Sequence, residues 1–207
     1  VLGMGNVGST LGRRWREVGH QVTFGVRDPA EKKAEAGKIN AAVASVPEAA
    51  AGAEVVLVAV PWTAPAVLTA AGDLSGKVLL DCTNPVTPEL DHLTVGFTTS
   101  SGEEVARVAP GTRVVKVFNT NGVGNVADPD YGPLKATMLY AGDHDDANTV
   151  AASLAAQIGM EPVYLGPLKE ARLLEPLAMT WILLARHRGL GRDFALNIVR
   201  RSDAKPG

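Results

Sequence analysis

The sequence predicts an α/β protein in which helices cover both faces of a mostly parallel sheet. Short apolar runs rich in valine and leucine alternate with alanine-rich amphipathic stretches along most of the chain, a pattern typical of repeated βαβ units. The 207 residues, 46% of them hydrophobic, suffice for one full domain of this class with a sizeable core. We expect this domain over residues 1–166 and a small C-terminal helical appendage over residues 167–207.

Charge and cysteine content limit the function classes. A formal net charge of -2 disfavours a general polyanion binder, so we expect no nucleic-acid partner. The single cysteine, Cys82, excludes an internal disulfide framework and cannot form a thiolate metal site by itself. No basic segment followed by an apolar stretch opens the sequence, and the apolar run over 177–185 is too short to cross a bilayer. We therefore expect a cytoplasmic protein with no metal site and no membrane partner.

The first two βα units follow from apolar spacing and from a glycine stop. Val1 and Leu2 read as the end of a first strand that stops just before a glycine motif. Apolar residues then recur at helical intervals as far as Val18, and Gly19 supplies a C-terminal stop, so we expect a helix there. The next expected elements are a strand over 21–26, a charged helix over 30–38 and a strand over 41–44.

Capping signals and apolar runs define the later elements. Ser45 with Glu48 and Ser101 with Glu104 have capping-box spacing, so each pair predicts a helix start. From Leu168 onward the pattern is helical only, and we expect a proline at position 176 to kink or break that helix. The other expected elements are strands over 54–60, 78–81, 114–118, 137–140 and 162–164, and helices over 64–71 and 145–158.

The opening Gly3-Met4-Gly5-Asn6-Val7-Gly8 matches the dinucleotide-binding fingerprint at its usual place between a strand and an amphipathic helix. In that fingerprint the first glycine permits the tight turn, the second lets the backbone approach a diphosphate, and the third allows close packing of helix on strand. The helix N-terminus then faces the negative charge. A glycine-rich turn without ligand is the alternative. The motif predicts a Rossmann-type, doubly wound fold that binds a dinucleotide.

The residues at the end of the second strand favour NADP(H) over NAD(H). An NAD enzyme usually carries an acidic residue here for the ribose 2′-hydroxyl. This chain has Val26 followed by Arg27, whose guanidinium suits a 2′-phosphate. Asp28 offers a competing interpretation, because it would either cap the next helix or reach a ribose. Lys32 and Lys33 are candidates for secondary phosphate contacts, or for a solvated helix face.

Ligands of this fold lie beyond the carboxyl ends of the strands, so the residues that follow each strand are further candidates. Trp62, after Pro61, would stack on the cofactor or pack on its own loop. Asn84 offers an amide for a ribose or carboxamide, although an asparagine before proline also starts turns. By position alone, the expected contacts of the second substrate are Asn119, Thr120 and Asn121.

No catalytic residue and no acid–base or metal-binding set emerges from the sequence. The four histidines are scattered, and Lys116 lies in an expected strand, where we expect it to mark a sheet edge or a strand end. Hydride transfer between two cofactors needs stacking and alignment more than acid or base groups. The sequence therefore favours an oxidoreductase whose chemistry belongs to its cofactors.

These residues together resemble a known family, the NADPH-dependent coenzyme F420 reductases, which reduce a 5-deazaflavin. The resemblance spans nearly the whole chain, and its C-terminal motifs are more specific than the glycine loop. The motifs that carry it are Gly3–Gly8, Gly25–Arg27, Val114–Thr120, Gly166–Leu168, Ala171-Arg172 and Leu174–Ala178.

The resemblance implies NADP(H) in the crevice, a deazaflavin or flavin against its nicotinamide, and direct hydride transfer. It carries over the glycine loop, Val26 and Arg27 as NADP contacts, with Val60, Pro61 and Asn84 near the nicotinamide half. The common serine before the arginine is Val26 here, which removes one hydroxyl from the 2′-phosphate site. Related domains of membrane ferric reductases share these motifs, so an NADPH-dependent flavin or ferric reductase and a non-catalytic NADP(H) sensor are the alternatives.

About forty residues follow the last expected strand, too few for the long helical domain that other NADP enzymes append to such a first domain. We expect this segment to cap the crevice or to pair with a second copy in a homodimer. The residues expected to do so are Trp181, Ile182, Leu183 and Leu184.

Overall fold

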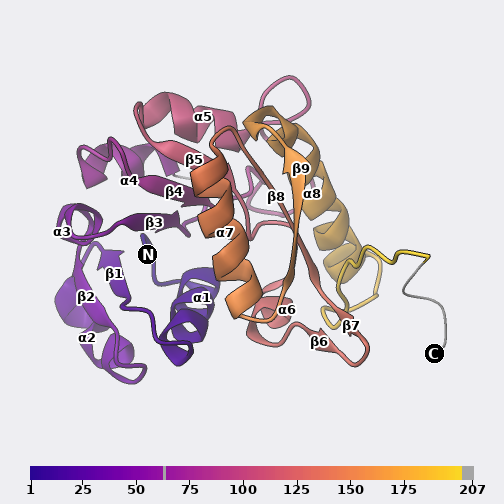
Figure 1. Ribbon diagram of the computed structural model, residues 1–207, viewed down its shortest axis with the longest axis horizontal. Coiled ribbons are helices and arrows are strands. Elements are labelled where there is room, and N and C mark those ends of the chain that lie inside the picture. The colour runs from indigo at the N-terminus through magenta and orange to yellow at the C-terminus, as the bar shows by residue number, and fades with distance from the viewer. Residues whose placement is uncertain (63, 202–207) are drawn as a thin grey trace.

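The computed structural model describes residues 1–62 and 64–201 and has the expected α/β architecture (Figure 1). Nine short strands and eight α-helices alternate over most of the described residues. The strands are β1 (Thr23–Val26), β2 (Ala42–Ser45), β3 (Val55–Val58), β4 (Val78–Asp81), β5 (Arg113–Lys116), β6 (Asp130–Tyr131), β7 (Leu134–Lys135), β8 (Thr137–Gly142) and β9 (Glu161–Gly166). The helices are α1 (Asn6–Glu17), α2 (Pro29–Gly37), α3 (Val46–Ala51), α4 (Ala64–Ala71), α5 (Ser101–Val108), α6 (Val123–Ala127), α7 (Asp145–Gln157) and α8 (Ala171–His187).

The sheet reverses its strand order at the glycine loop. Leu2 forms parallel bridges with Gly25 of β1 on one side and with Val58 of β3 on the other, so it acts as the expected first strand. Beyond β3 the order continues β4-β5-β8-β9, and β1 pairs with β2 on the opposite side. All these pairings are parallel except that of β5 with β8. The reversal point at Leu2 is where this fold class places its ligand crevice.

Two apolar cores lie on the two faces of the sheet. One includes Leu11 and Trp15 of α1 with Ala151 of α7, and α7 crosses in front of the strands in Figure 1. The other includes Leu68 of α4 and Val105 of α5. Among the described residues, no helix combines the length and apolar character that a membrane span requires.

The C-terminal segment differs from the expectation of a purely helical tail. The helix α8 runs through Pro176 without a break, so of the expected kink or break the break was wrong. After α8 the chain forms no further helix up to residue 201. It returns to β8 instead, where the amide of Thr137 donates to the carbonyl of Leu196 at 2.9 Å. This return also places Phe194 in a stack on Trp181, with ring centroids 5.1 Å apart.

One of the two predicted capping boxes is shifted by one residue. Glu48 accepts hydrogen bonds from the amide and the hydroxyl of Ser45, as expected for the first box. At α5 the cap is Ser100, whose hydroxyl accepts from the amide of Glu103. Ser101 lies inside the helix and is fully buried. The prediction of Ser101 as the cap was therefore wrong, and its hydroxyl donates instead to Oε1 of Glu175 in α8 at 2.6 Å.

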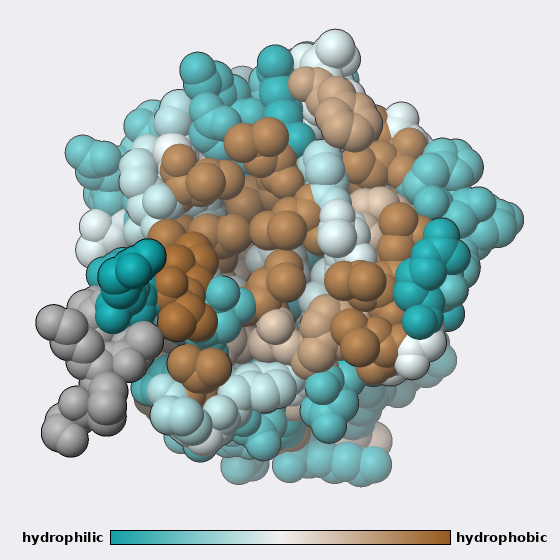
Figure 2. All heavy atoms as spheres, turned by 90° about the vertical axis from the view of Figure 1, so that its right-hand side faces the viewer, coloured by the Kyte–Doolittle hydropathy of each residue, from teal (hydrophilic) through white to brown (hydrophobic). Residues whose placement is uncertain are grey.

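Figure 2 shows a broad apolar surface on the side of the molecule that carries β9, α8 and the C-terminal segment. β9 is the last strand of its sheet, so one edge of it has no strand partner. Exposed apolar side chains in these elements are Tyr164, Leu165, Leu173, Leu190, Ile198 and Val199.

Candidate functional site

The glycine loop joins Leu2 to α1 at the reversal point of the sheet. Gly3 has φ +102°, and a methyl group placed on it would lie 2.5 Å from the carbonyl oxygen of Ala59. A methyl group on Gly8 would collide with the carbonyl oxygen of Gly3. The fold itself therefore requires glycine at both positions, the first for conformation and space and the second for space.

Gly5 differs from its two neighbours. It is the N-cap of α1 with φ -83° and ψ -171°, an extended conformation open to any residue. Nothing lies within 4 Å of a methyl group placed on it. Among the described residues no side chain caps the helix at this end, which leaves its first-turn amides available to a ligand. Neither strain nor packing demands glycine here, whereas a ligand lying against the backbone would.

A hollow of about 470 Å³ opens at this loop. The side-chain oxygen of Ser9, in the first turn of α1, is buried and has no hydrogen-bond partner among the described residues. Sequence reasoning missed Ser9, because a serine in a helical turn gives no signal until its surroundings are known. The residues lining the hollow are Met4, Gly5, Asn6, Ser9, Thr10, Lys32, Glu35 and Val123.

An exposed guanidinium follows the end of β1, the strand that pairs with Leu2 before the glycine loop. Arg27 directly follows the last residue of β1, is exposed, and forms no hydrogen bond or ion pair with another described residue. The carboxylate of Asp28 accepts from the amides of Ala30 at 3.0 Å and Glu31 at 3.2 Å, so it caps α2. Lys32 pairs with Glu35 at 2.9 Å on the rim of the hollow. Arg27 and the exposed Lys33 thus have no partner among the described residues and are available to a ligand.

The residues after β3 close one side of the glycine loop. A methyl group on Gly3 would lie 2.8 Å from Cγ1 of Val60, so Val60 is in contact with the loop. Pro61 is exposed. Trp62 is half-buried and packs against the apolar cluster on the α4 side of the sheet. Its ring therefore takes part in packing within its own region.

The two asparagines expected on opposite halves of the crevice contact each other. The amide nitrogen of Asn84 donates to the carbonyl of Asn119 at 3.0 Å, and the amide nitrogen of Asn119 donates to Oδ1 of Asn84 at 3.1 Å. Thr120 is buried, and its hydroxyl has no partner among the described residues. Asn121 bonds inward, to the carbonyl of Thr137 and to Asn125. The structure thus joins Asn84 and Asn119 into one unit, whereas both ends of the Asn121 side chain are already engaged.

A fully buried ionic cluster of Asp81, Lys116 and Glu175 lies next to this unit, and we call it the Lys116 cluster. Nζ of Lys116 is 2.9 Å from Oδ2 of Asp81 and 3.0 Å from Oε1 of Glu175, and all three side chains are inaccessible to solvent. Lys116 ends β5, which lies between β4 and β8 in the sheet. The expectation of a sheet edge was therefore wrong, and that of a strand end was correct.

Electrostatics keep Lys116 protonated inside the protein. Burial alone would lower the pKa of this amine, but the neighbouring Asp81 and Glu175 outweigh burial and hold the pKa above its ordinary value. A lysine that remains protonated and buried cannot act as a base or nucleophile near neutral pH. The Lys116 cluster thus holds a protonated amine, shielded from solvent, at the end of β5.

Cys82 is expected to be chemically inert. Burial, aided by the charge of Asp81, raises the pKa of its thiol to about 12. The thiol donates a hydrogen bond to the carbonyl oxygen of Val58, with Sγ 3.0 Å from that oxygen. Because the thiolate is the reactive form, the folded protein should resist thiol-specific reagents at any pH well below that value. Labelling followed by mass spectrometry should show no adduct in the folded protein and one adduct in concentrated urea. Labelling of the folded protein would contradict the burial of Cys82.

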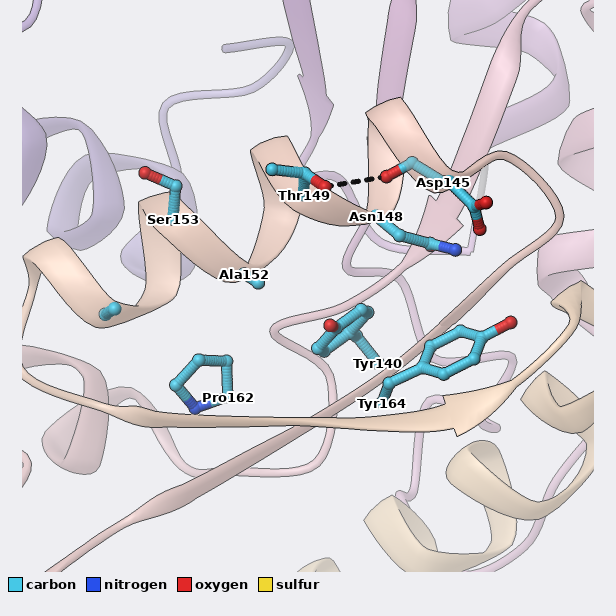
Figure 3. Close-up of a pocket in the computed structure, with 9 residues that line it drawn as sticks. Tyr140, Asp145, Asn148, Thr149, Ala152, Ser153, Pro162 and Tyr164 are labelled. Atoms are coloured by element: carbon cyan, nitrogen blue, oxygen red, sulfur yellow. Dashed lines mark hydrogen bonds between the residues drawn. The ribbon is translucent and has the colours of Figure 1, made fainter.

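A second hollow, of about 610 Å³, lies between α7 and the strands β8 and β9 (Figure 3). Tyr140 and Tyr164 stand beside each other in it, with ring centroids 5.6 Å apart. Its lining comes from these three elements and includes none of the crevice residues described above. Although this hollow is larger, the glycine-loop hollow combines a free helix N-terminus with an unpartnered hydroxyl and is the better candidate site. No grouping of metal-binding side chains occurs among the residues that the structure describes.

Comparison with known proteins identifies the family. The model of the family described as "NADP oxidoreductase coenzyme F420-dependent" matches residues 1–85. An F420-dependent NADP reductase of Methanothermobacter thermautotrophicus is 33% identical in an alignment that covers 92% of this chain and 91% of that protein. The chain belongs to the family of F420-dependent NADP reductases.

Other relatives agree with this family over different lengths. The crystal structure of a putative F420-dependent NADP reductase from Arthrobacter superposes with a TM-score of 0.86 at 32% identity, and covers 96% of this chain and 97% of that one. The rat metalloreductase STEAP3 is 32% identical over 86% of this chain, but the match covers only 36% of that larger protein. The F420-dependent reductases therefore match this chain along almost their whole length.

Proposed function

We propose that this protein transfers a hydride between NADP(H) and the deazaflavin coenzyme F420. Gly5 carries this proposal, because a glycine that neither the backbone nor the packing requires is explained by a diphosphate lying against it. The family relationship over nine-tenths of the chain supports the same function. Two-electron transfer as hydride is the chemistry that the bound nicotinamide supplies.

The residues around the glycine loop fit NADP(H). The first-turn amides of α1, the open space at Gly5 and the buried hydroxyl of Ser9 would hold the diphosphate. Arg27 would bind the 2′-phosphate, with Lys32 as a secondary contact. The remaining proposed cofactor contacts are Gly3, Met4, Asn6, Val7, Gly8, Val26, Val60, Pro61, Trp62 and Asn84.

On the acceptor side we propose Asn119 and Thr120, next to Asn84, with Asn121 as a support for their loop. These residues would orient the deazaflavin, and no proton acceptor is needed for the hydride itself. A flavin reductase is the alternative, but the ferric reductase relative matches over only about a third of its own length. We propose no catalytic acid or base, because hydride transfer between the two rings requires neither.

The function is tested by oxidation of NADPH with coenzyme F420, FMN and FAD offered in parallel to the purified protein. We expect rapid turnover with F420 and little with either flavin. Turnover with the flavins alone would favour the flavin reductase. Binding of NADPH without turnover on any acceptor would contradict an enzymatic function and favour a sensor.

Arg27→Ala should weaken NADPH binding by about 10- to 100-fold, because a charge-assisted phosphate contact contributes about 1.5–3 kcal/mol. NADH lacks the 2′-phosphate, so its affinity should stay the same. Isothermal titration calorimetry with both nucleotides measures the difference. Arg107→Ala is the matched control, because this arginine pairs with Glu104 on the surface. Equal losses for NADPH and NADH would contradict the 2′-phosphate contact.

Val26→Ser should strengthen NADPH binding by about threefold, since it restores a hydroxyl beside Arg27. The gain corresponds to one exposed hydrogen bond of about 0.5–1 kcal/mol. In the double variant with Arg27→Ala the gain should shrink, because the two residues would share one phosphate. Unchanged affinity in Val26→Ser would show that the phosphate lies elsewhere.

We further propose a cytosolic homodimer, with the C-terminal segment from residue 167 capping the crevice or joining two copies; positions 202–207 of the segment expected from the sequence lie outside the described residues. The unpaired edge of β9 and the apolar surface around α8 support pairing of two copies, since monomers rarely expose such patches. Size-exclusion chromatography with light scattering should give twice the mass of one chain. A species of 21.6 kDa alone would contradict the dimer.

A further inference from the structure

The Lys116 cluster carries one uncompensated negative charge. Each carboxylate oxygen accepts a hydrogen bond from a fixed donor: those of Asp81 from Lys116 and the amide of Thr83, those of Glu175 from the amides of Ser101 and Gly102. Oxygens that all accept from such donors belong to ionised carboxylates. Two carboxylates and one ammonium group leave a net charge of -1.

This charge lies at the carboxyl edge of the sheet, on the side of the proposed nicotinamide half. Asp81 and Lys116 are the last residues of β4 and β5, and they stand opposite each other in the register of these strands. Nζ of Lys116 donates to the carbonyl of Thr83 at 2.5 Å, immediately before Asn84. The carbonyl of Leu174, next to Glu175, accepts from Asn119 at 3.3 Å. The cluster thus reaches Asn84 through the neighbouring Thr83, and Asn119 through the carbonyl group of Leu174.

Burial weakens the screening of this charge by water and salt. The three side chains have no solvent exposure, so their field acts through protein of low effective dielectric constant and dissolved salt screens it much less than a surface charge. The two α5 amides that bind Glu175 spread part of the charge along that helix. A fraction of one full charge therefore reaches the crevice.

Oxidised nicotinamide carries a positive charge that reduced nicotinamide lacks. We propose that the Lys116 cluster makes the protein bind NADP⁺ more tightly, relative to NADPH, than the crevice would without it. Asp81 and Glu175 act as positioning residues through their charge and contact no substrate. This inference rests on the proposed function, because it requires a nicotinamide in this crevice.

Tighter binding of NADP⁺ relative to NADPH would favour hydride donation from NADPH. Each tenfold increase in the preference for NADP⁺ over NADPH lowers the two-electron reduction potential of the bound couple by about 30 mV. The bound nicotinamide thereby becomes a stronger reductant of any acceptor laid against it. A buried charge that needs no proton transfer is a simple way to set this potential.

The test compares the dissociation constants of NADP⁺ and NADPH by calorimetry in Glu175→Gln and Asp81→Asn. Both variants keep the shape of the side chain and neutralise one charge. We expect each to reduce the preference for NADP⁺ by about threefold or more. Glu104→Gln is the matched control, because it removes a carboxylate from the surface of α5, and its ratio should not change.

A structural role alone would weaken both nucleotides equally, so an unchanged ratio in two folded variants overturns the inference. If neither variant folds, the unmodified protein decides: its ratio should persist as salt is raised, and a ratio that disappears with salt overturns the inference. Absence of binding by the unmodified protein would overturn the proposed function itself. The two failures are thus distinguishable.

Discussion

Gly5→Ala is expected to fold like the unmodified protein and to lose NADPH affinity by tenfold or more. The added methyl group meets no atom within 4 Å and the backbone conformation suits alanine, so the loss of stability should be limited to the poorer N-cap preference of alanine, about 1 kcal/mol or less. The same methyl group would occupy the space in which the diphosphate approaches the backbone. A tenfold loss corresponds to about 1.4 kcal/mol of binding free energy. Calorimetry with NADPH and thermal unfolding of the same sample measure both quantities.

Gly8→Ala is the matched comparison, because here the methyl group collides with the carbonyl oxygen of Gly3. We expect a loss of stability of about 1–3 kcal/mol, typical of an overpacked site. The pair separates a glycine needed by a ligand from a glycine needed by the fold. Normal NADPH affinity in Gly5→Ala would contradict a diphosphate at this loop.

Lys116→Met should be the most destabilising of the proposed substitutions, with a loss of about 3–5 kcal/mol. Removing the ammonium group leaves Asp81 and Glu175 buried without their cation, and uncompensated buried charges cost that much. Urea unfolding measures the loss. Lys77→Met is the control, because Lys77 binds two carbonyl groups at the surface and should cost less than about 1 kcal/mol. Equal losses for the two lysines would contradict the account of the cluster.

The pH dependence of this stabilisation follows from the direction of the Lys116 pKa. The folded protein holds the pKa above the ordinary value of 10.5 that applies to the unfolded chain. The contribution is therefore complete below pH 10.5 and is lost as pH rises through the folded-state pKa. The difference in stability between Lys116→Met and the unmodified protein should stay constant near neutral pH. A difference that disappears near neutral pH would contradict a raised pKa.

The sequence allowed correct prediction of elements whose apolar spacing is regular. The strand at 78–81 was predicted with its observed bounds, because a short apolar run marks a strand buried on both faces. The bounds of α1 and α7 were predicted within about one residue from their helical spacing. The tail after His187 has no such period, and hydrogen bonds to β8, distant in sequence, determine its path. Local pattern alone could not have shown that return.

Ser101 and Lys116 show the same limit at the site. Two serines and two glutamates stand side by side near the start of α5, so spacing allows two capping boxes. The observed cap is Ser100, because Ser101 is buried against Glu175. The hydroxyl of Ser101 donates to this residue, 74 positions away in the sequence. Lys116 suggested a sheet edge because a lysine in an apolar strand has no visible partner. Its partners come from β4 and α8, and only the fold brings them together.

Direct hydride transfer from NADPH to the deazaflavin can be followed by isotope transfer. The protein would be mixed with coenzyme F420 and NADPH that carries deuterium on the transferred position of the nicotinamide. We expect the reduced F420 to gain one deuterium, measured by mass spectrometry, because the hydride passes between the two rings without exchange with solvent. Reduced F420 that contains only hydrogen from water would contradict direct transfer and, with it, the arrangement proposed for this crevice.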